Sequence, residues 1–440
     1  MIQMPTPLRY IKVAFLLIAL LHSPADLHAQ SASTAEARIT VDTLTSVSMS
    51  GRGYERDGHM IAALYIASRF RALGLDSLAE GYLHPFTFRH WGFTPDLSLR
   101  IGSRSMVPGR DYIPAGRSGS GSVTGEEKIV RAGDGLVVPS AGIDAYRGLA
   151  PMGAIVVIDE KVNAEATADT MIPRARLGTW ERVIDAVRLG ARGVIVLVDR
   201  LTYEGPQQGI SIPVFELLRD SMPADPGPVS FTIGRAPRNV VTNNIVAVLR
   251  GDGSSDSIIM ICGHYDHLGM LGDSVYFPGA NDNASGIALM LEVARELRSR
   301  PLRYTVVFAA FSAEEVGVVG SRKFAERPPL DLSRIRFLLN LDMTASGVDG
   351  IMALGGAENP EEVTLLRSVA DSIGIAEVRT RANAPISDHF FFLRNGIRGF
   401  YLYPFVGYQP YHNIGDRPET LQWDVFEKMR GAVLGFLRKL

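Results

Sequence analysis

The sequence has one cysteine, Cys262, in 440 residues. A single thiol excludes an intrachain disulfide framework, a CxxC redox pair and every zinc site that needs several cysteines. Cys262 lies in an apolar segment, where we expect a buried, inert thiol. Any metal site in this protein must therefore be built mainly from His, Asp and Glu.

The chain also lacks an excess of charge of either sign. Its 45 Lys and Arg residues and 47 Asp and Glu residues give a formal net charge of -2. This balance provides no strong field for nucleic acid or for an anionic membrane surface. Hydrophobic residues make up 46% and charged residues 21%, values typical of folded globular proteins. We therefore expect a folded protein with no nucleic-acid partner.

No hydrophobic run is long enough to span a bilayer. The apolar stretch at 13–21 falls short of the roughly 20 residues that a membrane-spanning helix needs. Arg9 and Lys12 precede it, and Ala29 offers a small residue for cleavage, as in an export signal. The sequence predicts a signal peptide over 1–29 and an exported protein, periplasmic or secreted, with no integral membrane segment after its removal.

Two common hydrolase motifs are missing. No G-x-S-x-G elbow occurs, which disfavours a serine hydrolase. No H-E-x-x-H sequence occurs, which excludes the zinc-protease pattern in which both ligands lie on one helix. Hydrolytic chemistry, if present, must use residues that are distant in the sequence.

Strands and helices alternate in the C-terminal half, which predicts an α/β fold with a mixed central sheet covered by helices on both faces. The expected strands are 245–249, 258–262, 304–311, 337–341 and 400–405, and the expected helices are 285–299, 321–326 and 421–437. Further upstream, helical spacing predicts an amphipathic helix over 58–74. Its apolar face would carry Ile61, Leu64, Tyr65, Ile66, Phe70 and Leu73.

The middle of the chain has a different texture. It combines a Gly/Ser-rich stretch with short strands expected at 128–131, 154–158, 194–198 and 212–215, and a helix at 180–189. We therefore expect an inserted β-rich domain. The predicted organisation is a signal peptide at 1–29, an N-terminal part of the main domain at 30–110, the insertion at 111–237 and the rest of the main domain at 238–440.

Polar groups that can bind metals follow several of the apolar strands. They are His264-Tyr265-Asp266-His267, Asp282-Asn283-Ala284-Ser285-Gly286, Glu314-Glu315, Asp342 and Tyr411-His412. Each group alone is typical of an ordinary surface. Ligands gather at the carboxyl ends of strands in α/β sheets, so five such groups together favour a shared site. Imidazoles with several carboxylates suit Zn²⁺, with Mn²⁺ or Co²⁺ as alternatives.

The series HYDH, DNASG, EE followed by GxxGS, NLDM, SDH and YH resembles the M28 family of zinc exopeptidases, which includes bacterial aminopeptidases and glutamate carboxypeptidase-like enzymes. The resemblance covers most of the mature chain. Upstream, SMSGRGYERDGH and YIASRFRALGL are similar to the opening region of the family. In the insertion, GARGVIVLVD followed by ISIPVF resembles a protease-associated domain.

The resemblance implies a site with two zinc ions. His264 and Asp342 would bind one ion, Glu315 and His412 the other, and Asp282 would bridge both. Glu314 would be the general base, and the phenol of Tyr411 would stabilise the oxyanion.

Four further residues have expected places near this site. Asp266 would orient the imidazole of His264. His267 competes with His264 as a ligand by residue type, although the family pattern favours His264. Asp388 and His389 would line the substrate cleft or hold a loop beside it. The resemblance also implies a strained peptide after Asp282.

By this resemblance, the chain would be an exported two-zinc aminopeptidase that removes N-terminal residues from peptides, through a metal-bridging water and a glutamate base. Three alternatives remain: a glutamate carboxypeptidase-like enzyme, a glutaminyl-cyclase-like enzyme with one zinc, and a non-catalytic receptor-like ectodomain. The complete set of matched ligands favours the two-zinc enzyme. The oligomeric state is left open.

Overall fold

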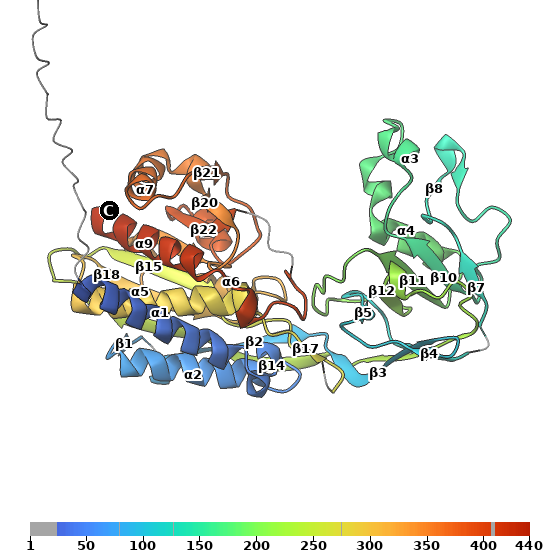
Figure 1. The fold of residues 1–440 in the computed structure, drawn as a ribbon, viewed down its shortest axis with the longest axis horizontal. Coiled ribbons are helices and arrows are strands. Elements are labelled where there is room, and N and C mark those ends of the chain that lie inside the picture. Colours follow the sequence, from blue (N-terminus) through green and yellow to red (C-terminus); the bar gives the residue numbers. More distant parts are fainter. Residues whose placement is uncertain (1–23, 79, 126, 274, 406–409) are drawn as a thin grey trace, which may run out of the picture.

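The computed structural model describes residues 24–440 except 79, 126, 274 and 406–409, and it has two lobes side by side (Figure 1). The first 23 residues of the predicted signal peptide lie outside the described residues. The helix α1 (Pro24–Leu44) begins directly after them. Within the described ranges, no helix combines the length and apolar character needed to cross a bilayer.

The larger lobe is built on one mixed sheet. Its strand order is β1-β14-β18-β15-β19-β22-β20-β21, with β2 also paired to β14. The strands are β1 (Asp76–Ser77), β2 (Leu83–His90), β14 (Arg238–Leu249), β15 (Ile258–His264), β18 (Thr305–Phe311), β19 (Ile335–Leu341), β20 (Val348–Leu354), β21 (Val378–Arg381) and β22 (Gly399–Phe405). β15 runs parallel to β18 and β19, and β19 parallel to β22. The carboxyl ends of these four strands therefore share one edge.

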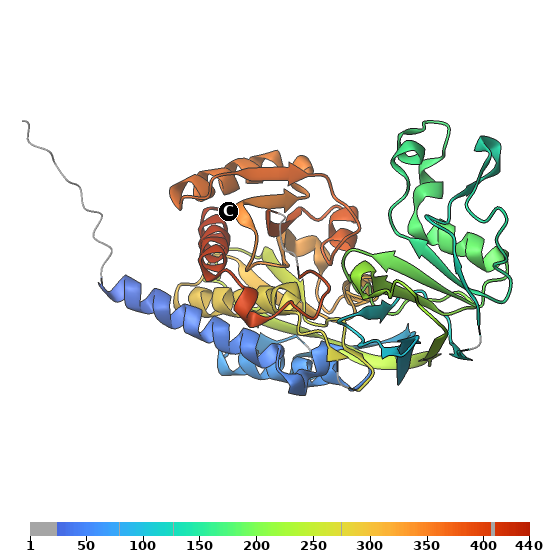
Figure 2. The ribbon, with the colours of Figure 1, turned by 45° about the vertical axis from the view of Figure 1, so that its right-hand side comes forward.

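Helices cover both faces of this sheet, which confirms the predicted fold class (Figure 2). They are α1, α2 (Gly58–Ala72), α5 (Gly286–Ser299), α6 (Val319–Glu326), α7 (Pro360–Ser372), α8 (Phe390–Arg394) and α9 (Trp423–Lys439). Successive strand residues point to opposite faces. Ile261 accordingly joins the core under α1, α2, α5, α7 and α9, whereas Cys262 joins the core under α6 and α8. Cys262 is a buried free thiol, as expected, and burial raises its pKa.

The helix α2 forms where expected, but its predicted apolar face is wrong in part. Ile61 and Leu64 are 43% and 57% exposed. The buried face instead combines Ile66 and Phe70 with small residues, Ala62, Ala63 and Ala67. Small side chains let the helix lie close to the sheet. The prediction counted only large apolar residues, so it placed the buried face on the wrong side of part of the helix.

The second lobe contains two further sheets. The first has the order β5-β12-β11-β10-β7, in which β7, β10, β11 and β12 are parallel, and the second has the order β4-β3-β13-β6. Their strands are β3 (Phe93–Ile101), β4 (Arg104–Ser105), β5 (Tyr112–Pro114), β6 (Gly121–Thr124), β7 (Ile129–Arg131), β10 (Ile155–Asp159), β11 (Gly193–Val198), β12 (Val214–Leu218) and β13 (Val229–Arg235). The lobe also contains α3 (Ala164–Ala168), α4 (Thr179–Arg188) and the hairpin of β8 (Val137–Val138) and β9 (Ile143–Asp144).

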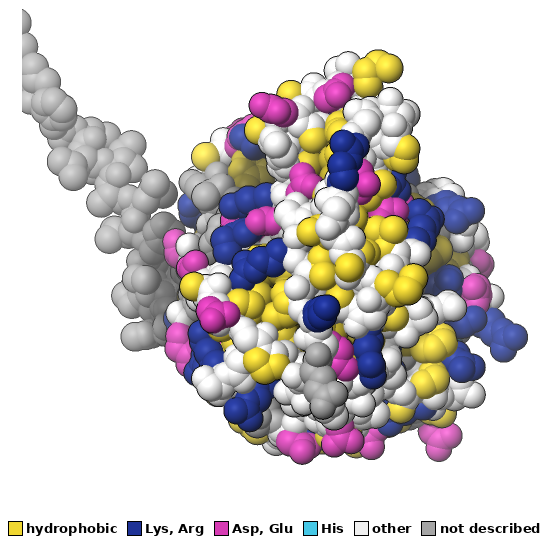
Figure 3. All heavy atoms as spheres, turned by 90° about the vertical axis from the view of Figure 1, so that its right-hand side faces the viewer, with side chains coloured by type: hydrophobic (Ala, Val, Ile, Leu, Met, Phe, Trp, Pro, Cys, Tyr) yellow, Lys and Arg dark blue, Asp and Glu magenta, His cyan; other side chains and the backbone are white. Residues whose placement is uncertain are grey.

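The strands of the second lobe begin upstream of residue 111, because β3 pairs with β13. Its core also contacts Leu271 of the hairpin formed by β16 (Met270–Leu271) and β17 (Val275–Tyr276). On the outer face of the lobe, side chains of both charge signs are interspersed with apolar ones (Figure 3). The assignment of 111–237 to a protease-associated domain stays a prediction.

Gly286 allows α5 to begin directly against the end of β19. A Cβ at this position would overlap Asn283 Oδ1 and the carbonyl oxygen of Leu341. We expect Gly286→Ala to lower the free energy of unfolding by about 1–3 kcal/mol, as overpacking does. The matched control is Gly431→Ala in α9, where the nearest atom to a new Cβ is the end of the Ile373 side chain at 3.3 Å.

Because alanine favours a helix interior over glycine, the control should be neutral or stabilising by about 0.5–1 kcal/mol. Thermal and urea unfolding of both variants would measure the difference. Equal stability of Gly286→Ala and the wild type would contradict the close approach.

Candidate metal centre

Strand ends bring the candidate ligands to one edge of the main sheet. His264 is the last residue of β15, and Asp342 directly follows β19. Glu314 and Glu315 lie in the segment after β18. Asp282 lies in the irregular turn at Ala280–Ser285 that leads into α5, and the Asp282–Asn283 peptide bond is cis. Residues distant in the sequence thus meet because the strands that precede them are parallel neighbours.

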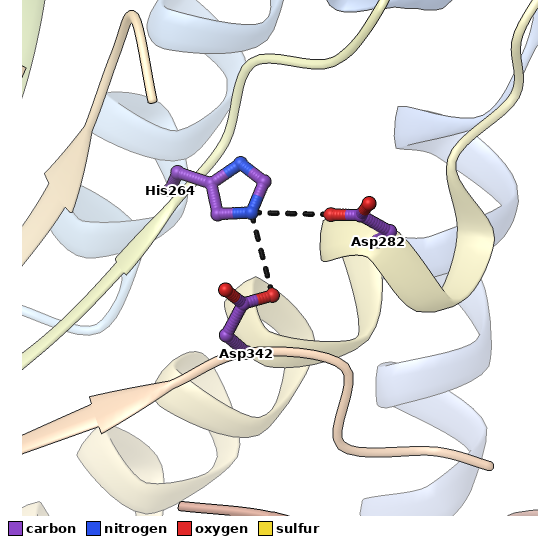
Figure 4. Close-up of side chains that lie close together, drawn as sticks. All are labelled: His264, Asp282 and Asp342. Carbon is purple, nitrogen blue, oxygen red and sulfur yellow. Dashed lines mark ion pairs between the residues drawn. The ribbon is translucent and has the colours of Figure 1, made fainter. Parts of the chain in front are cut away.

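All five predicted ligands lie within two contiguous groups. His264 Nε2 is 3.2 Å from Asp282 Oδ1 and 3.4 Å from Asp342 Oδ1 (Figure 4). His412 Nε2 is 3.1 Å from Asp282 Oδ2 and 3.2 Å from Glu315 Oε2. Each carboxylate oxygen of Asp282 therefore faces a different group, which is the position that a bridging ligand would take.

The structure also places His267 beside the second group. His267 Nδ1 is 2.6 Å from Glu315 Oε1. Ligand atoms of His267, Asp282 and Glu315 lie within 4.8 Å of one another, as do those of His264, Asp282 and Asp342. The second group thus has two imidazoles, those of His267 and His412, in contact with Glu315. His267 therefore competes as a ligand with His412 and not, as the sequence suggested, with His264.

The charges of these groups depend on one another. Burial raises the pKa of Asp282, but hydrogen bonds with His264 and His412 outweigh it and hold that pKa well below its usual value. Burial also raises the pKa of Glu315, and His412 and His267 lower it to about 2. Burial lowers the pKa of His412, but Glu315 and Asp282 raise it well above the usual range. The carboxylates of Asp282 and Glu315 are therefore ionised and attract positive charge, which a proton on His412 supplies in part when no metal is bound.

The donor set fits a zinc ion. Buried polar atoms are normally hydrogen-bonded, yet Asp342 Oδ1 and His267 Nε2 are buried without a hydrogen-bond partner among the described residues. Asp342 Oδ1 lies 3.4 Å from His264 Nε2, and carboxylate oxygens and imidazole nitrogens are ligands of the type that Zn²⁺ takes in proteins. The residues present therefore match a site of imidazole nitrogens and carboxylate oxygens.

Glu314 differs from the other carboxylates because its side chain is unpaired. No described residue forms a hydrogen bond or an ion pair with its carboxylate. Burial raises its pKa well above the usual value, and the neighbouring Glu315, Asp388 and Asp342 act in the same direction despite His264. A carboxylate of this kind accepts a proton readily.

Tyr411 is the partly exposed neighbour of His412. Its side chain is 37% exposed, and its ring stacks on that of His412 with centroids 3.8 Å apart. Burial and the surrounding carboxylates raise its pKa. The phenol therefore stays protonated near neutral pH and remains a hydrogen-bond donor.

Asp266 is completely buried, and its carboxylate lies within ion-pair distance, though not hydrogen-bond distance, of the imidazole that it was expected to orient. His264 Nδ1 is 3.1 Å from the backbone oxygen of Asp266 and 3.8 Å from its Oδ1. The carboxylate instead accepts hydrogen bonds from the Tyr54 hydroxyl at 2.9 Å and from the Glu314 backbone N–H at 3.1 Å. Asp266 thus holds the backbone of Glu314, and its carbonyl oxygen meets His264.

Asp388 and His389 are also completely buried, so neither lines an open surface. Burial raises the pKa of Asp388 to about 7 and lowers that of His389 to about 3. Their neighbour Ser387 contacts the site: its hydroxyl donates to Asp342 Oδ2 at 2.9 Å and accepts from Asn340 Nδ2 at 2.8 Å. Within the SDH segment, the serine is the residue that holds a candidate ligand.

Sequence reasoning missed a second supporting residue, Asp416. Its carboxylate accepts the backbone N–H groups of Asn281 at 2.7 Å and Asp282 at 3.0 Å. Asp416 lies four residues after His412, so the segment that carries one candidate ligand also holds the backbone of another. The sequence shows that Asp416 lies close to His412. It gives no sign that the Asp416 carboxylate binds a turn more than a hundred residues away.

Three residues at the site have positive backbone φ angles, a region that costs non-glycine residues of order 1–3 kcal/mol each. They are Ala313 (60°), Met343 (57°) and His412 (53°). A backbone group of each of these three residues forms a hydrogen bond with another segment or side chain. The second lobe holds His412, because the N–H of Tyr203 donates to its carbonyl oxygen at 2.9 Å.

Asn413 reinforces this link between the lobes. Its Nδ2 donates to the carbonyl oxygen of Leu201 at 2.9 Å, and its Oδ1 accepts from the N–H of Gly415 at 2.9 Å. The loop that carries His412 is thus bonded to the second lobe through both backbone and side chain.

We expect Asn413→Asp to keep the bond to Gly415 and to lose the bond to Leu201, because a carboxylate cannot donate. Asn413→Ala should lose both. Hydrogen exchange of the Tyr203 amide and of residues 410–416 should be faster in both variants, by an amount equivalent to about 1 kcal/mol per lost bond. Unchanged exchange in both would show that this side chain does not hold the loop.

Comparisons with known proteins find a family match for the second half of the chain. Residues 244–437 match the family described as Peptidase family M28. The Bacillus subtilis protein named Aminopeptidase YwaD is 27% identical over 65% of this chain and 56% of its own length. A Pyricularia oryzae protein named "Probable zinc metalloprotease" is 31% identical over 37% of this chain and 32% of its own. This chain therefore spans less than two thirds of either relative.

A solved structure supports the fold over nearly the whole chain. The zinc aminopeptidase BSAP of Bacillus subtilis is 22% identical, with a TM-score of 0.69, over 92% of this chain and 94% of that one. At this identity the likeness concerns the fold. Together with the family match, it confirms the resemblance drawn from the motifs: the chain contains a domain of peptidase family M28, at residues 244–437.

Proposed function

We propose that the protein is an exported zinc aminopeptidase with two zinc ions per chain. The observation that carries this proposal is the position of Asp282, whose two carboxylate oxygens each face a separate group of buried imidazole and carboxylate ligands. The family match and the names of the relatives support peptide hydrolysis. His264 and Asp342 would hold one ion and Glu315 and His412 the other.

Bound zinc would polarise the scissile carbonyl and lower the pKa of water at the site. Glu314 then has the properties of the general base. Its carboxylate is unpaired, and its raised pKa lets it take a proton from water and later donate that proton to the leaving amine. The Asp266 carboxylate positions Glu314 by accepting its backbone N–H.

Tyr411 would take part in the same reaction. Its protonated phenol can donate a hydrogen bond to the oxygen on which negative charge develops. The stack on His412 limits the freedom of the ring. This role matches the position that the sequence resemblance implies for Tyr411.

The side chains around the site favour a free amine over a terminal carboxylate as the recognised group. A carboxypeptidase would need cationic side chains directed at the substrate. Arg52, whose guanidinium interacts electrostatically with the carboxylates of Asp282 and Glu315, donates its hydrogen bonds to backbone carbonyls and is completely buried.

Export is supported by the N-terminal sequence. A basic start, a short apolar run and a small residue at 29 form the pattern of a cleaved signal. The protein would then act on peptides in the periplasm or outside the cell. The second lobe, bonded to the loop of His412, would shape access to the cleft.

The role of Glu314 can be tested by Glu314→Gln. We expect the variant to keep its zinc and to lose at least about 100-fold in kcat, the contribution of a general base. The assay is hydrolysis of free-amine and N-acetylated peptides, with zinc measured on the same samples. Glu326→Gln, which changes an exposed acid on α6, is the matched control and should behave as the wild type. Near wild-type turnover of Glu314→Gln would reject the base assignment.

The shared position of Asp282 predicts an uneven loss of metal. The wild type should contain about two zinc ions per chain, as a two-metal site requires. Asp342→Ala should keep about one, because it touches one group, and Asp282→Ala should keep almost none. Mass spectrometry of purified, desalted protein would give these ratios. Retention of two ions by Asp282→Ala would contradict the bridge.

A further inference from the structure

Arg52 is a completely buried cation close to the candidate metal centre. It ends the short 3-10 segment Val47–Arg52, which precedes α2. A guanidinium has five N–H donors, and burial of such a charge is costly unless all are satisfied. The carboxylates that face it are those of Asp416, Asp282, Asp266 and Glu315.

All five N–H groups of Arg52 point to backbone carbonyl oxygens. Nε donates to Tyr265 at 2.7 Å. Nη1 donates to Leu44 at 2.9 Å and to Pro278 at 2.6 Å, and Nη2 to Gly279 at 2.8 Å and to Asp282 at 3.3 Å. The guanidinium therefore joins three segments: the end of α1, the residue after His264, and the turn that carries Asp282.

The backbone around Arg52 and the backbone around Gly279 both have conformations that permit these hydrogen bonds. Ser50, Gly51 and Arg52 have consecutive positive φ angles of 46°, 61° and 51°, a run that L-residues seldom adopt. On the other side, Gly279 has a φ of 63°, and a Cβ there would lie 2.5 Å from Arg52 Nη2. Both partners thus use unusual conformations that allow the guanidinium to reach the carbonyl groups.

We propose that Arg52 is a positioning residue, which fixes the segment of His264 and the turn of Asp282 relative to each other before any cation binds. Arg52 acts through the backbone, since its hydrogen bonds are with carbonyl oxygens and not with the side chains of the candidate ligands. The proposal rests on the proposed function for the identity of the cation, but the order of the two segments can be measured without it.

The test compares Arg52→Lys with Arg182→Lys. Arg182 is 1% exposed and also donates to backbone carbonyls, those of Asp134, Asp159 and Glu160, but it lies in the second lobe. Lysine keeps the charge and loses the planar fork that spans several carbonyls. Both variants should unfold at a lower temperature than the wild type. Only Arg52→Lys should alter the hydrogen exchange and the zinc affinity of the site.

The first readout is hydrogen exchange of the metal-free chain. Exchange at 264–268 and 278–284 should be faster in Arg52→Lys and unchanged in Arg182→Lys. Arg52→Gln, which also removes the charge, should show a larger increase, because the facing carboxylates then repel one another without compensation. Wild-type exchange of these segments in Arg52→Lys, or failure of both Arg52 variants to fold, would overturn the proposal.

The second readout is zinc affinity, measured by competition with a chromophoric chelator. We expect Arg52→Lys to bind zinc at least about tenfold more weakly, as for residues that orient metal ligands. Saturated with zinc, it should show a lower kcat and an unchanged KM. Equal weakening by Arg182→Lys would indicate a general structural role and contradict the proposal. A wild type that binds no zinc would refute the proposed function, and the exchange data would still decide the role of Arg52.

Discussion

The site depends on the position of Asp282 between two imidazoles. Its Oδ1 faces His264 and its Oδ2 faces His412, so one carboxylate joins two groups that come from opposite ends of the domain sequence. The turn that carries it is held from three directions. Arg52 binds its carbonyl oxygens, Asp416 binds its N–H groups, and the start of α5 packs against β19. Displacement of this turn would separate both groups at once.

The surrounding charges explain why such a site needs a cation. Several carboxylates are buried together with three imidazoles, and buried charges require partners. Without metal, the raised pKa values of His264 and His412 supply part of the compensation. A divalent cation replaces these protons, so metal binding releases them and weakens at low pH. Glu314 stays outside these pairs, which leaves its carboxylate available for proton transfer.

The sequence predicted regular elements well, since apolar periodicity determines them. The strand expected at 258–262 is observed at Ile258–His264, and the helix expected at 285–299 at Gly286–Ser299. The motifs also located the residues that meet at the sheet edge. Contacts between distant segments could not be predicted from the sequence. Nothing in the SDH motif indicates that Ser387 donates a hydrogen bond to Asp342. The positive φ angles of Ser50, Gly51 and Arg52 likewise leave no pattern of apolar residues that would predict them. The buried face of α2 was misplaced because its close packing uses alanines.

The most direct test of this account is zinc anomalous diffraction from crystals of the full-length mature protein. We predict two peaks about 3.5–4 Å apart, the spacing of two-metal hydrolytic sites. One should lie among His264, Asp282 and Asp342, and the other between Asp282 and Glu315, where its distance to His412 and His267 identifies the imidazole that binds it. A single peak, or peaks that do not share Asp282, would contradict the central claim.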